Sequence, residues 1–132
     1  MADHNDAFLK LAAAARANIK EVSPEEAGKL VKDGALLIDV RDKEEFAKSH
    51  LKNAQHLSRG TLEMKIGNLA PDTGAAIVLY CAGGNRGALA AESLQRMGYS
   101  NVYSIEGGLS AYIAQAKTQI EASKKSKGET KH

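Results

Sequence analysis

The 132-residue chain is predicted to fold as an α/β domain with a mostly parallel central sheet and helices on both faces. Two continuous apolar runs, at residues 35–40 and 76–80, are typical of strands that are buried on both faces. Segments with helical signals separate these strands, as connections between parallel strands require. The length suits one domain, because chains divide into separate cores mainly beyond about 250 residues.

The first half of the chain contains the clearest helix start. Ser23 is placed to cap a helix, Pro24 takes its first position and Glu26 its third, so the three residues can form a capping box. Asp6 is placed to cap an extra N-terminal helix in the same way. The expected elements of this half are helix 6–18, strand 19–22, a helix from Pro24 that stops at Gly34, strand 35–40 and helix 44–49.

In the second half, turn residues mark the ends of the elements, as in the turn Pro71–Gly74. Gly98 is expected to end one helix, and the pair Gly107–Gly108 to open the last one. The expected elements are strand 55–57, helix 61–69, strand 76–80, helix 87–97, strand 102–105 and a final helix to about residue 120. The chain is therefore divided into a helical extension at 1–18, the α/β domain at 19–120 and a flexible basic tail at 121–132.

Composition excludes several classes of protein. With a single cysteine, Cys81, the chain is not a disulfide scaffold, and its four histidines show no ligand spacing, so no metal or other cofactor is expected. No apolar run approaches the roughly 20 residues that a membrane helix needs. The net charge of +2 comes from residues 121–132, and there is no Trp, so binding to nucleic acid is not expected. Acidic residues and Lys10 in the N-terminal segment disfavour a secretory signal and favour a cytoplasmic location.

The loop after the second buried strand carries the chemistry. Cys81 lies at the edge of the sheet where α/β proteins bind ligands. Glycines at positions 83, 84 and 87 permit positive φ, so that successive amides can turn inward and form a nest for an anion, beside the positive end of the next helix. A thiol placed there should ionise easily, since the amides and the helix dipole stabilise the thiolate. Arg86 adds a permanent charge and a planar fork of donors suited to an oxyanion.

A lone cysteine at a strand end is often only a small buried apolar residue. The glycines, the arginine and the strand-loop-helix context favour a cysteine nucleophile instead.

Several segments resemble the signatures of the rhodanese family of sulfurtransferases, in order and at suitable distances. Together they cover about residues 20–115, which makes the set more specific than any one short motif. They are CAGGNR at 81–86, similar to the active-site loop, LIDVR at 37–41 with Glu45–Phe46, SHLKNA at 49–54, the segment 57–63, and the segment 102–112.

The departures from the family pattern lie outside the cysteine loop. Ser49 stands where glycine is usual, Lys52–Asn53 where Pro-Gly is usual, and Tyr112 where Trp is usual. Asn tolerates a left-handed turn, so the bend after Leu51 can survive.

The resemblance implies a rhodanese-like domain at 19–120 that acts as a thiosulfate sulfurtransferase. In this mechanism the Cys81 thiolate takes the outer sulfur of thiosulfate or a related donor, sulfite leaves, and a persulfide remains. A thiophilic acceptor such as cyanide or a dithiol then removes the sulfur, so the partners are small molecules. Arg86 is expected to orient the sulfonate end of the donor. The substrate-binding residues are Ala82, Gly83, Gly84, Asn85 and Arg86, whose amides hold the negative charge of the persulfide.

Loop length separates this activity from its alternatives. Four residues lie between Cys81 and Arg86, whereas the related cysteine phosphatases of the tyrosine and dual-specificity kinds have five. The smaller ring of amides suits one sulfur atom better than a phosphate ester, which disfavours a phosphatase or an arsenate reductase. A persulfide carrier would use the same chemistry and remains an alternative. A non-catalytic rhodanese-like binding module is disfavoured, because such relatives typically lack the cysteine.

Five further residues are expected near the site. Asp39 and Arg41 end the strand 35–40 and are expected to brace the turn as an ion pair rather than to contact substrate. His50 is expected to be a structural hydrogen-bonding residue at a turn. The resemblance places Arg59 at the rim of the pocket, where it is a candidate for binding an anionic donor, with Glu63 as its structural partner.

Overall fold

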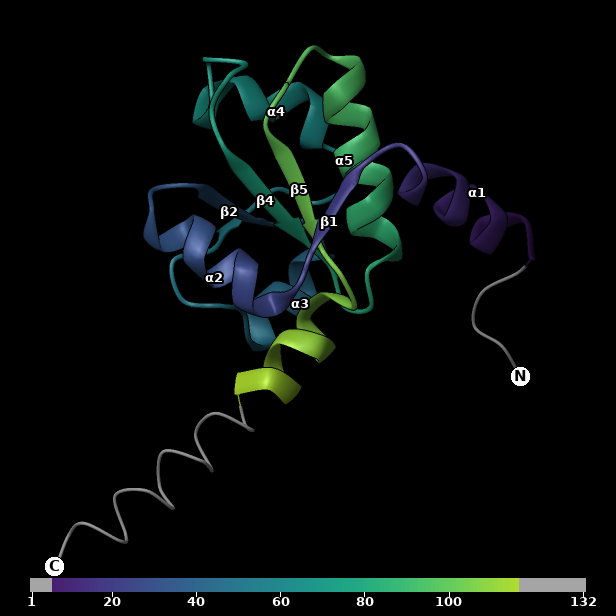
Figure 1. Cartoon of the computed structure of the whole chain (residues 1–132), viewed down its shortest axis with the longest axis vertical. Coiled ribbons are helices and arrows are strands. Elements are labelled where there is room, and N and C mark those ends of the chain that lie inside the picture. The colour runs from purple at the N-terminus through teal and green to yellow at the C-terminus, as the bar shows by residue number, and fades with distance from the viewer. Residues whose placement is uncertain (1–5, 117–132) are drawn as a thin grey trace, which may run out of the picture.

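Five strands form one parallel sheet in the order β1-β5-β4-β2-β3 (Figure 1). The structure is a computed structural model, and it describes residues 6–116. The strands are β1 (Lys20–Val22), β2 (Leu36–Asp39), β3 (Gln55–His56), β4 (Ile77–Tyr80) and β5 (Val102–Ile105). The predicted parallel sheet is therefore confirmed, and β4, which leads into the cysteine loop, lies at its centre.

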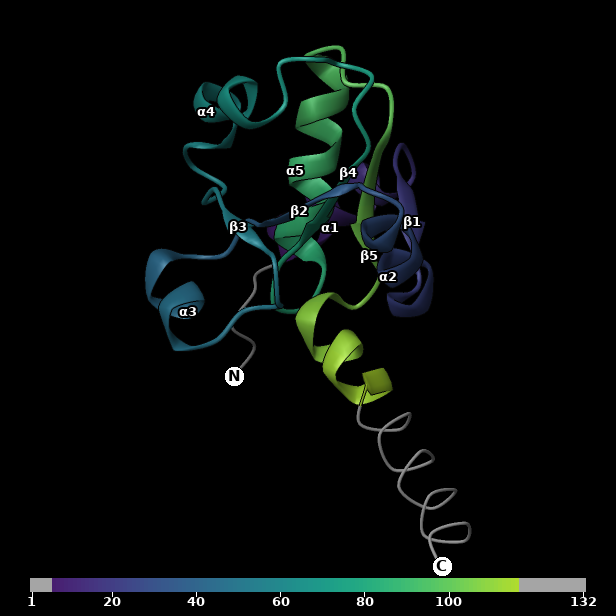
Figure 2. The same ribbon diagram turned by 90° about the vertical axis from the view of Figure 1, so that its left-hand side faces the viewer.

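Helices cover both faces of the sheet, as the sequence predicts. Figure 2 shows α4 and α5 on one side of the strands and α2 on the other, with α3 beneath the end of β3. The helices are α1 (Asp6–Arg16), α2 (Pro24–Lys32), α3 (Lys43–Lys48), α4 (Leu62–Leu69), α5 (Asn85–Arg96) and a last helix over residues 108–116, which Figure 1 draws in yellow-green. Because parallel strands all end at one edge, this arrangement brings the loops after β2, β4 and β5 together.

The sheet separates two hydrophobic cores, because side chains alternate along each strand. Ile38 and Leu79 point into the core under α4 and α5, whereas Leu37 and Val78 point into the core under α2. All four residues of β4 have no exposed surface, which matches the continuous apolar run from which this strand was predicted.

Local signals place most helix ends near their predicted positions. The Ser23 hydroxyl accepts from the Glu26 amide at 3.1 Å and the Glu26 carboxylate accepts from the Ser23 amide at 3.1 Å, so the predicted capping box is present. α5 begins at Asn85, two residues earlier than predicted. The reason is that Gly84, with φ of 107°, turns the chain directly into the helix.

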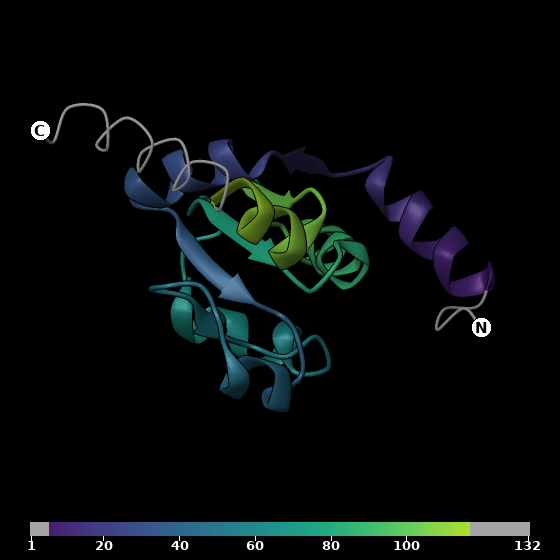
Figure 3. The ribbon, with the colours of Figure 1, turned by 90° about the horizontal axis from the view of Figure 1, so that it is seen from below.

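The predicted extra N-terminal helix is present as α1, and it packs against α5 (Figure 3, purple and green). Ala12 and Ala15 are fully buried, and their small side chains let the two helices approach closely. The tail predicted at 121–132 and the last helix beyond residue 116 lie outside the described residues. Within the described part of the chain, no helix is long and apolar enough to cross a membrane.

Candidate active site

Cys81 follows β4 directly and is 1% exposed. Its Sγ accepts hydrogen bonds from two backbone amides, Gly84 N at 3.0 Å and Gly87 N at 3.3 Å. Of the amides predicted to hold the sulfur, those of residues 82–86, only that of Gly84 reaches Sγ. The amide of Gly87 was missing from that set, although the glycine pattern of the loop could have indicated it.

The residues between these two amides form the first turn of α5. The N–H groups of Asn85 and Arg86 have no acceptor four residues earlier within the helix, because they belong to its first turn. They add to the positive end of the helix dipole beside the sulfur. Gly87 must be a glycine, since a Cβ there would lie 2.9 Å from the Ser104 hydroxyl on β5. This close packing fixes the start of α5 under the loop.

The helix over residues 108–116 fixes the other side of the loop. The Leu109 amide donates to the Cys81 carbonyl at 2.8 Å and the Ser110 amide to the Ala82 carbonyl at 3.1 Å. Gly108 has φ of 61°, and a Cβ on it would lie 2.6 Å from the Cys81 carbonyl oxygen. The loop carbonyls thus serve as partners for the first amides of this helix, and the loop amides stay free to face the sulfur.

Arg86 binds a carboxylate of α3. Its Nη1 and Nη2 donate to the two carboxylate oxygens of Glu45 at 2.8 and 3.1 Å. Arg86 lowers the pKa of Glu45 to about 2, and the bond to Glu45 raises the pKa of Arg86. The structure therefore pairs both terminal nitrogens of Arg86 with a residue that the sequence analysis assigned no role. No local signal reveals this pair, since the partners are far apart in sequence.

Asp39 and Arg41 form a buried ion pair at the end of β2. Arg41 Nε and Nη2 donate to the Asp39 carboxylate at 3.0 and 2.8 Å, and the Arg41 amide donates to the same carboxylate at 2.9 Å. Arg41 Nη2 also donates to the carbonyl oxygen of Ser49 at 2.6 Å. His56 Nε2 donates to the carbonyl oxygen of Arg41 at 2.7 Å. These bonds join the end of β2 to the turn after α3 and to β3, which is the geometry of a brace.

The turn that contains His50 is held by aromatic stacking and by β4. The His50 ring stacks on Phe46 with 3.8 Å between centroids, and its Nδ1 donates to the Phe46 carbonyl at 2.9 Å. The Tyr80 hydroxyl accepts from the Leu51 amide at 3.1 Å, and burial raises the pKa of that hydroxyl. Asn53 takes the left-handed conformation expected of it, with φ of 70°.

Arg59 and Glu63 form an ion pair with 2.7 Å between Arg59 Nη1 and Glu63 Oε2. The hydroxyl of Ser93 on α5 donates to the same carboxylate oxygen. Arg59 lines a hollow between α1 and α5 together with Leu11, Leu89, Glu92, Ser93 and Arg96. This lining contains no residue of the cysteine loop, and the structure pairs Arg59 with Glu63. Contact between Arg59 and substrate stays a prediction.

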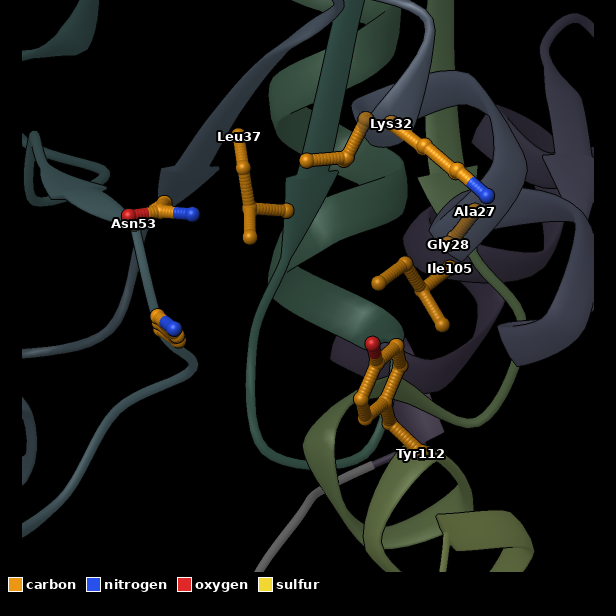
Figure 4. Close-up of a pocket in the computed structure, with 9 residues that line it drawn as sticks. Ala27, Gly28, Lys32, Leu37, Asn53, Ile105 and Tyr112 are labelled. Carbon is orange, nitrogen blue, oxygen red and sulfur yellow. The ribbon is translucent and has the colours of Figure 1, made fainter.

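A second cavity, of about 240 Å³, lies on the α2 side of the sheet (Figure 4). Figure 4 shows Ile105 of β5 and Tyr112 of the last helix beside it. Its lining is formed by Ala27, Gly28, Val31, Lys32, Leu37, Lys52, Asn53, Ile105 and Tyr112. Cys81 and the loop amides are not among these residues, so this cavity is separate from the sulfur site. Residues 6–116 contain no cluster of three or more potential metal-ligating side chains.

Cys81 thus lies between the central parallel strand and the start of α5, and two backbone amides hold its sulfur. Residues 23–115 match the rhodanese-like domain, and the chain belongs to the rhodanese-like family. Two relatives that it resembles in sequence are named thiosulfate sulfurtransferases. Thiosulfate sulfurtransferase GlpE of Ectopseudomonas mendocina (strain ymp) is 35% identical over 95 residues, which cover 72% of this chain and 85% of the relative. The relative of the same name from Pseudomonas entomophila is 39% identical over 89 residues, covering 67% and 80%.

Solved structures agree with this assignment of the fold. The polysulfide-sulfur transferase homodimer of Wolinella succinogenes has a TM-score of 0.70 and 33% identity, with 83% of this chain and 84% of that chain covered. A Rhodopseudomonas palustris protein of unknown function, described as a possible tyrosine phosphatase, has a TM-score of 0.74 and 28% identity, with 88% and 94% covered.

Proposed function

We propose that this protein is a thiosulfate sulfurtransferase that works through a Cys81 persulfide. The observation that carries the proposal is the pair of hydrogen bonds from Gly84 N and Gly87 N to Cys81 Sγ. Preorganised amides stabilise a sulfur anion without having to reorganise during the reaction. The similarity to curated thiosulfate sulfurtransferases over most of their length supports the same choice of donor.

In the first half-reaction the Cys81 thiolate attacks the outer sulfur of thiosulfate. A bond forms between Sγ and that sulfur as the S–S bond of thiosulfate breaks, and its electron pair leaves with sulfite. The product is a persulfide anion, and we expect the amides of Asn85 and Arg86, which have no acceptor within the first turn of α5, to stabilise it. In the second half-reaction, cyanide or a dithiol attacks the outer sulfur of the persulfide and regenerates the Cys81 thiolate.

Sulfur transfer is favoured over phosphate ester hydrolysis by the size of the loop. With four residues between Cys81 and Arg86, the loop is shorter than in the cysteine phosphatases, and a smaller ring of amides suits a single sulfur atom on the cysteine better than a phosphate ester. We place the reaction in the cytoplasm, where thiols are kept reduced.

Mass spectrometry after incubation with thiosulfate alone tests this proposal. We expect the protein to gain one sulfur atom and an equal amount of sulfite to appear. Since the chain has no second cysteine, no internal disulfide can discharge the persulfide. Cyanide should then restore the original mass and release thiocyanate. Cys81→Ser should keep its far-UV circular dichroism spectrum and form no adduct, because a hydroxyl is not ionised near neutral pH and cannot form a persulfide.

A phosphate ester and arsenate serve as alternative substrates in the same experiment. If thiosulfate leaves no adduct while a phosphate ester is hydrolysed with dependence on Cys81, the argument from loop size is wrong and the protein is a phosphatase. If the folded wild-type protein catalyses neither reaction, the proposed activity is wrong and the protein is a non-catalytic binding module.

A further inference from the structure

The helix that precedes the family match brings a cation to the cysteine loop. α1 ends at Arg16, seven residues before the start of the match at residue 23. α1 is anchored on α5 by the buried Ala12 and Ala15, so the position of Arg16 is set by packing between two helices. Just after the helix, the Asn18 side chain donates to Glu92 of α5 at 3.0 Å and holds the end of α1 in place.

The Arg16 guanidinium lies against two residues of the loop. Its Nη2 donates to the side-chain oxygen of Asn85. The same nitrogen lies 3.6 Å from the position that a Cβ on Gly84 would take. These are the residues that begin α5, and the amide of Gly84 is the shorter of the two bonds to the sulfur. Arg16 therefore reaches the outer rim of the amide ring from outside the domain.

Arg16 and Arg86 differ in how far their charge is already neutralised. Arg86 has both terminal nitrogens on the Glu45 carboxylate. Arg16 makes a single longer ion pair, 3.4 Å from its Nε to the carboxylate of Glu21, and its side chain is 33% exposed. A bidentate pair satisfies more of the charge and of the donors than a one-point contact does. Arg16 thus keeps N–H donors available at the rim.

The donor needs a cation at this place. Thiosulfate is a dianion, and it approaches a thiolate that is also negative. Displacement at the outer sulfur requires the leaving sulfite to point away from Cys81 Sγ, so the sulfonate oxygens lie outside the amide ring. A guanidinium at the rim reduces the repulsion between the two anions and donates to sulfonate oxygens.

We propose that Arg16 is a donor-positioning residue, which binds the sulfonate end of an anionic sulfur donor at the rim of the loop. α1 is then part of the active site rather than only an extension of the fold. This inference rests on the proposed sulfur transfer, and it assigns to a residue outside the family match part of the role that the sequence analysis gave to Arg86.

Kinetics with two donors test the proposal. The first is thiosulfate, and the second is methanethiosulfonate, in which a methyl group replaces one sulfonate oxygen and one negative charge is lost. Arg16→Ala should raise KM for thiosulfate about tenfold, the loss expected for a hydrogen bond to a charged group, with kcat changed less than about threefold. KM for methanethiosulfonate should rise only about threefold, because one charge and one acceptor are missing. Arg16→Lys should recover part of the thiosulfate effect, since it keeps the charge and loses the fork.

Two further variants should lower KM for thiosulfate or leave it unchanged. Glu21→Gln removes the carboxylate that pairs with Arg16 and competes with thiosulfate for it, so KM for thiosulfate should fall about twofold. Arg96→Ala removes an arginine of α5 whose side chain is 79% exposed, and its kinetics should equal those of the wild type. The rate at which dithiothreitol discharges the preformed persulfide should change less than about twofold in Arg16→Ala, because this acceptor has no sulfonate to hold.

The outcomes separate this inference from the proposed function. If Arg16→Ala has wild-type kinetics in an active enzyme, Arg16 does not position the donor. If KM rises equally for both donors and persulfide discharge also slows, Arg16 only supports the loop, and the inference is wrong as well. A wild-type protein that transfers no sulfur from either donor overturns the proposed function together with the inference. If no sulfur is transferred, thiosulfate binding can still be measured in Cys81→Ser. Replacing Arg16 in that variant should then not weaken the binding of thiosulfate.

Discussion

Two arginine-carboxylate pairs lie at the same edge of the sheet and differ in their burial. In the pair Asp39–Arg41 the side chains are 0% and 6% exposed, whereas in the pair Glu45–Arg86 they are 34% and 29% exposed. The first pair lies within one turn, and the second joins α3 to the start of α5. Water can replace the partner of an exposed charge but not of a buried one. The buried pair therefore supports the fold, and the exposed pair supports the cysteine loop.

The two pairs also differ in what surrounds them. Arg41 also donates from Nη2 to the carbonyl of Ser49, and its side chain is only 6% exposed, so little of this guanidinium is accessible to a substrate anion. Arg86 keeps its Nε, and its charge lies on the first turn of α5 beside Cys81. The pairs share the same chemistry, and the exposed surface around Arg86 is what makes it the candidate for binding a substrate anion.

Breaking the buried pair should have the largest effect. Arg41→Ala leaves the fully buried Asp39 carboxylate without its partner, and removing one member of a buried pair costs about 3–5 kcal/mol of the free energy of unfolding. Urea unfolding followed by circular dichroism measures this loss. Arg96→Ala, which removes an exposed arginine, should change the free energy by less than about 0.5 kcal/mol. A similar small loss in Arg41→Ala would show that water reaches Asp39 and that the pair is not a brace.

Breaking the exposed pair should affect activity more than stability. Arg86→Ala should lower the free energy of unfolding by less than about 1 kcal/mol, because the pair is solvated. It should raise KM for thiosulfate about tenfold, and Arg86→Lys should recover only part, because Lys cannot make a two-point contact. Steady-state kinetics with thiosulfate and cyanide measure both variants. Equal KM and kcat in all three proteins would show that Arg86 has no part in donor binding.

The exposed pair should also have its own pH dependence. The pKa of Glu45 is lowered from 4.5 to about 2, so the folded state binds the proton of this carboxyl less tightly than the unfolded state does. The stabilisation is therefore complete above about pH 5 and is lost as the pH falls from about 4.5 towards 2. The free energies of unfolding of wild type and Glu45→Gln should differ by a constant amount above pH 5 and converge below it. A difference that does not change down to pH 2 would contradict the assigned pair.

The sequence predicts what is encoded locally. The capping box at Ser23, the buried strand before Cys81 and the glycines of the loop each lie within a few residues, so the fold, the position of Cys81 and the amides at its sulfur follow from short patterns. The sequence predicts a start of α5 two residues too late, because no local pattern shows that Gly84 takes the left-handed conformation at the helix cap.

The partners that complete the site could not be predicted in this way. Glu45 and Arg86 are 41 residues apart, and Arg16 and Asn85 are 69 apart, so only the packing of α3 and α1 against the loop brings them together. A charged residue on a helix surface gives no signal that distinguishes such a partner from a solvated side chain. The local pair Asp39–Arg41 was found because its members are two residues apart on a turn.

Breaking the pair Arg59–Glu63 should have the smallest effect on stability and on KM. It tests whether exposure alone distinguishes the pair Glu45–Arg86 from a surface pair. The side chains of Arg59 and Glu63 are 34% and 37% exposed, similar to those of Glu45–Arg86, but the pair joins the turn before α4 to a residue four positions later in α4, and its hollow contains no loop residue. Exposed pairs at this spacing contribute about 0.3–0.5 kcal/mol. Arg59→Ala should therefore lower the free energy of unfolding by about that amount and change KM for thiosulfate less than about twofold, with Lys65→Ala on the exposed face of α4 as the control. If KM rises about tenfold instead, Arg59 binds the donor, and a hollow without loop residues does not suffice to tell a site arginine from a surface one.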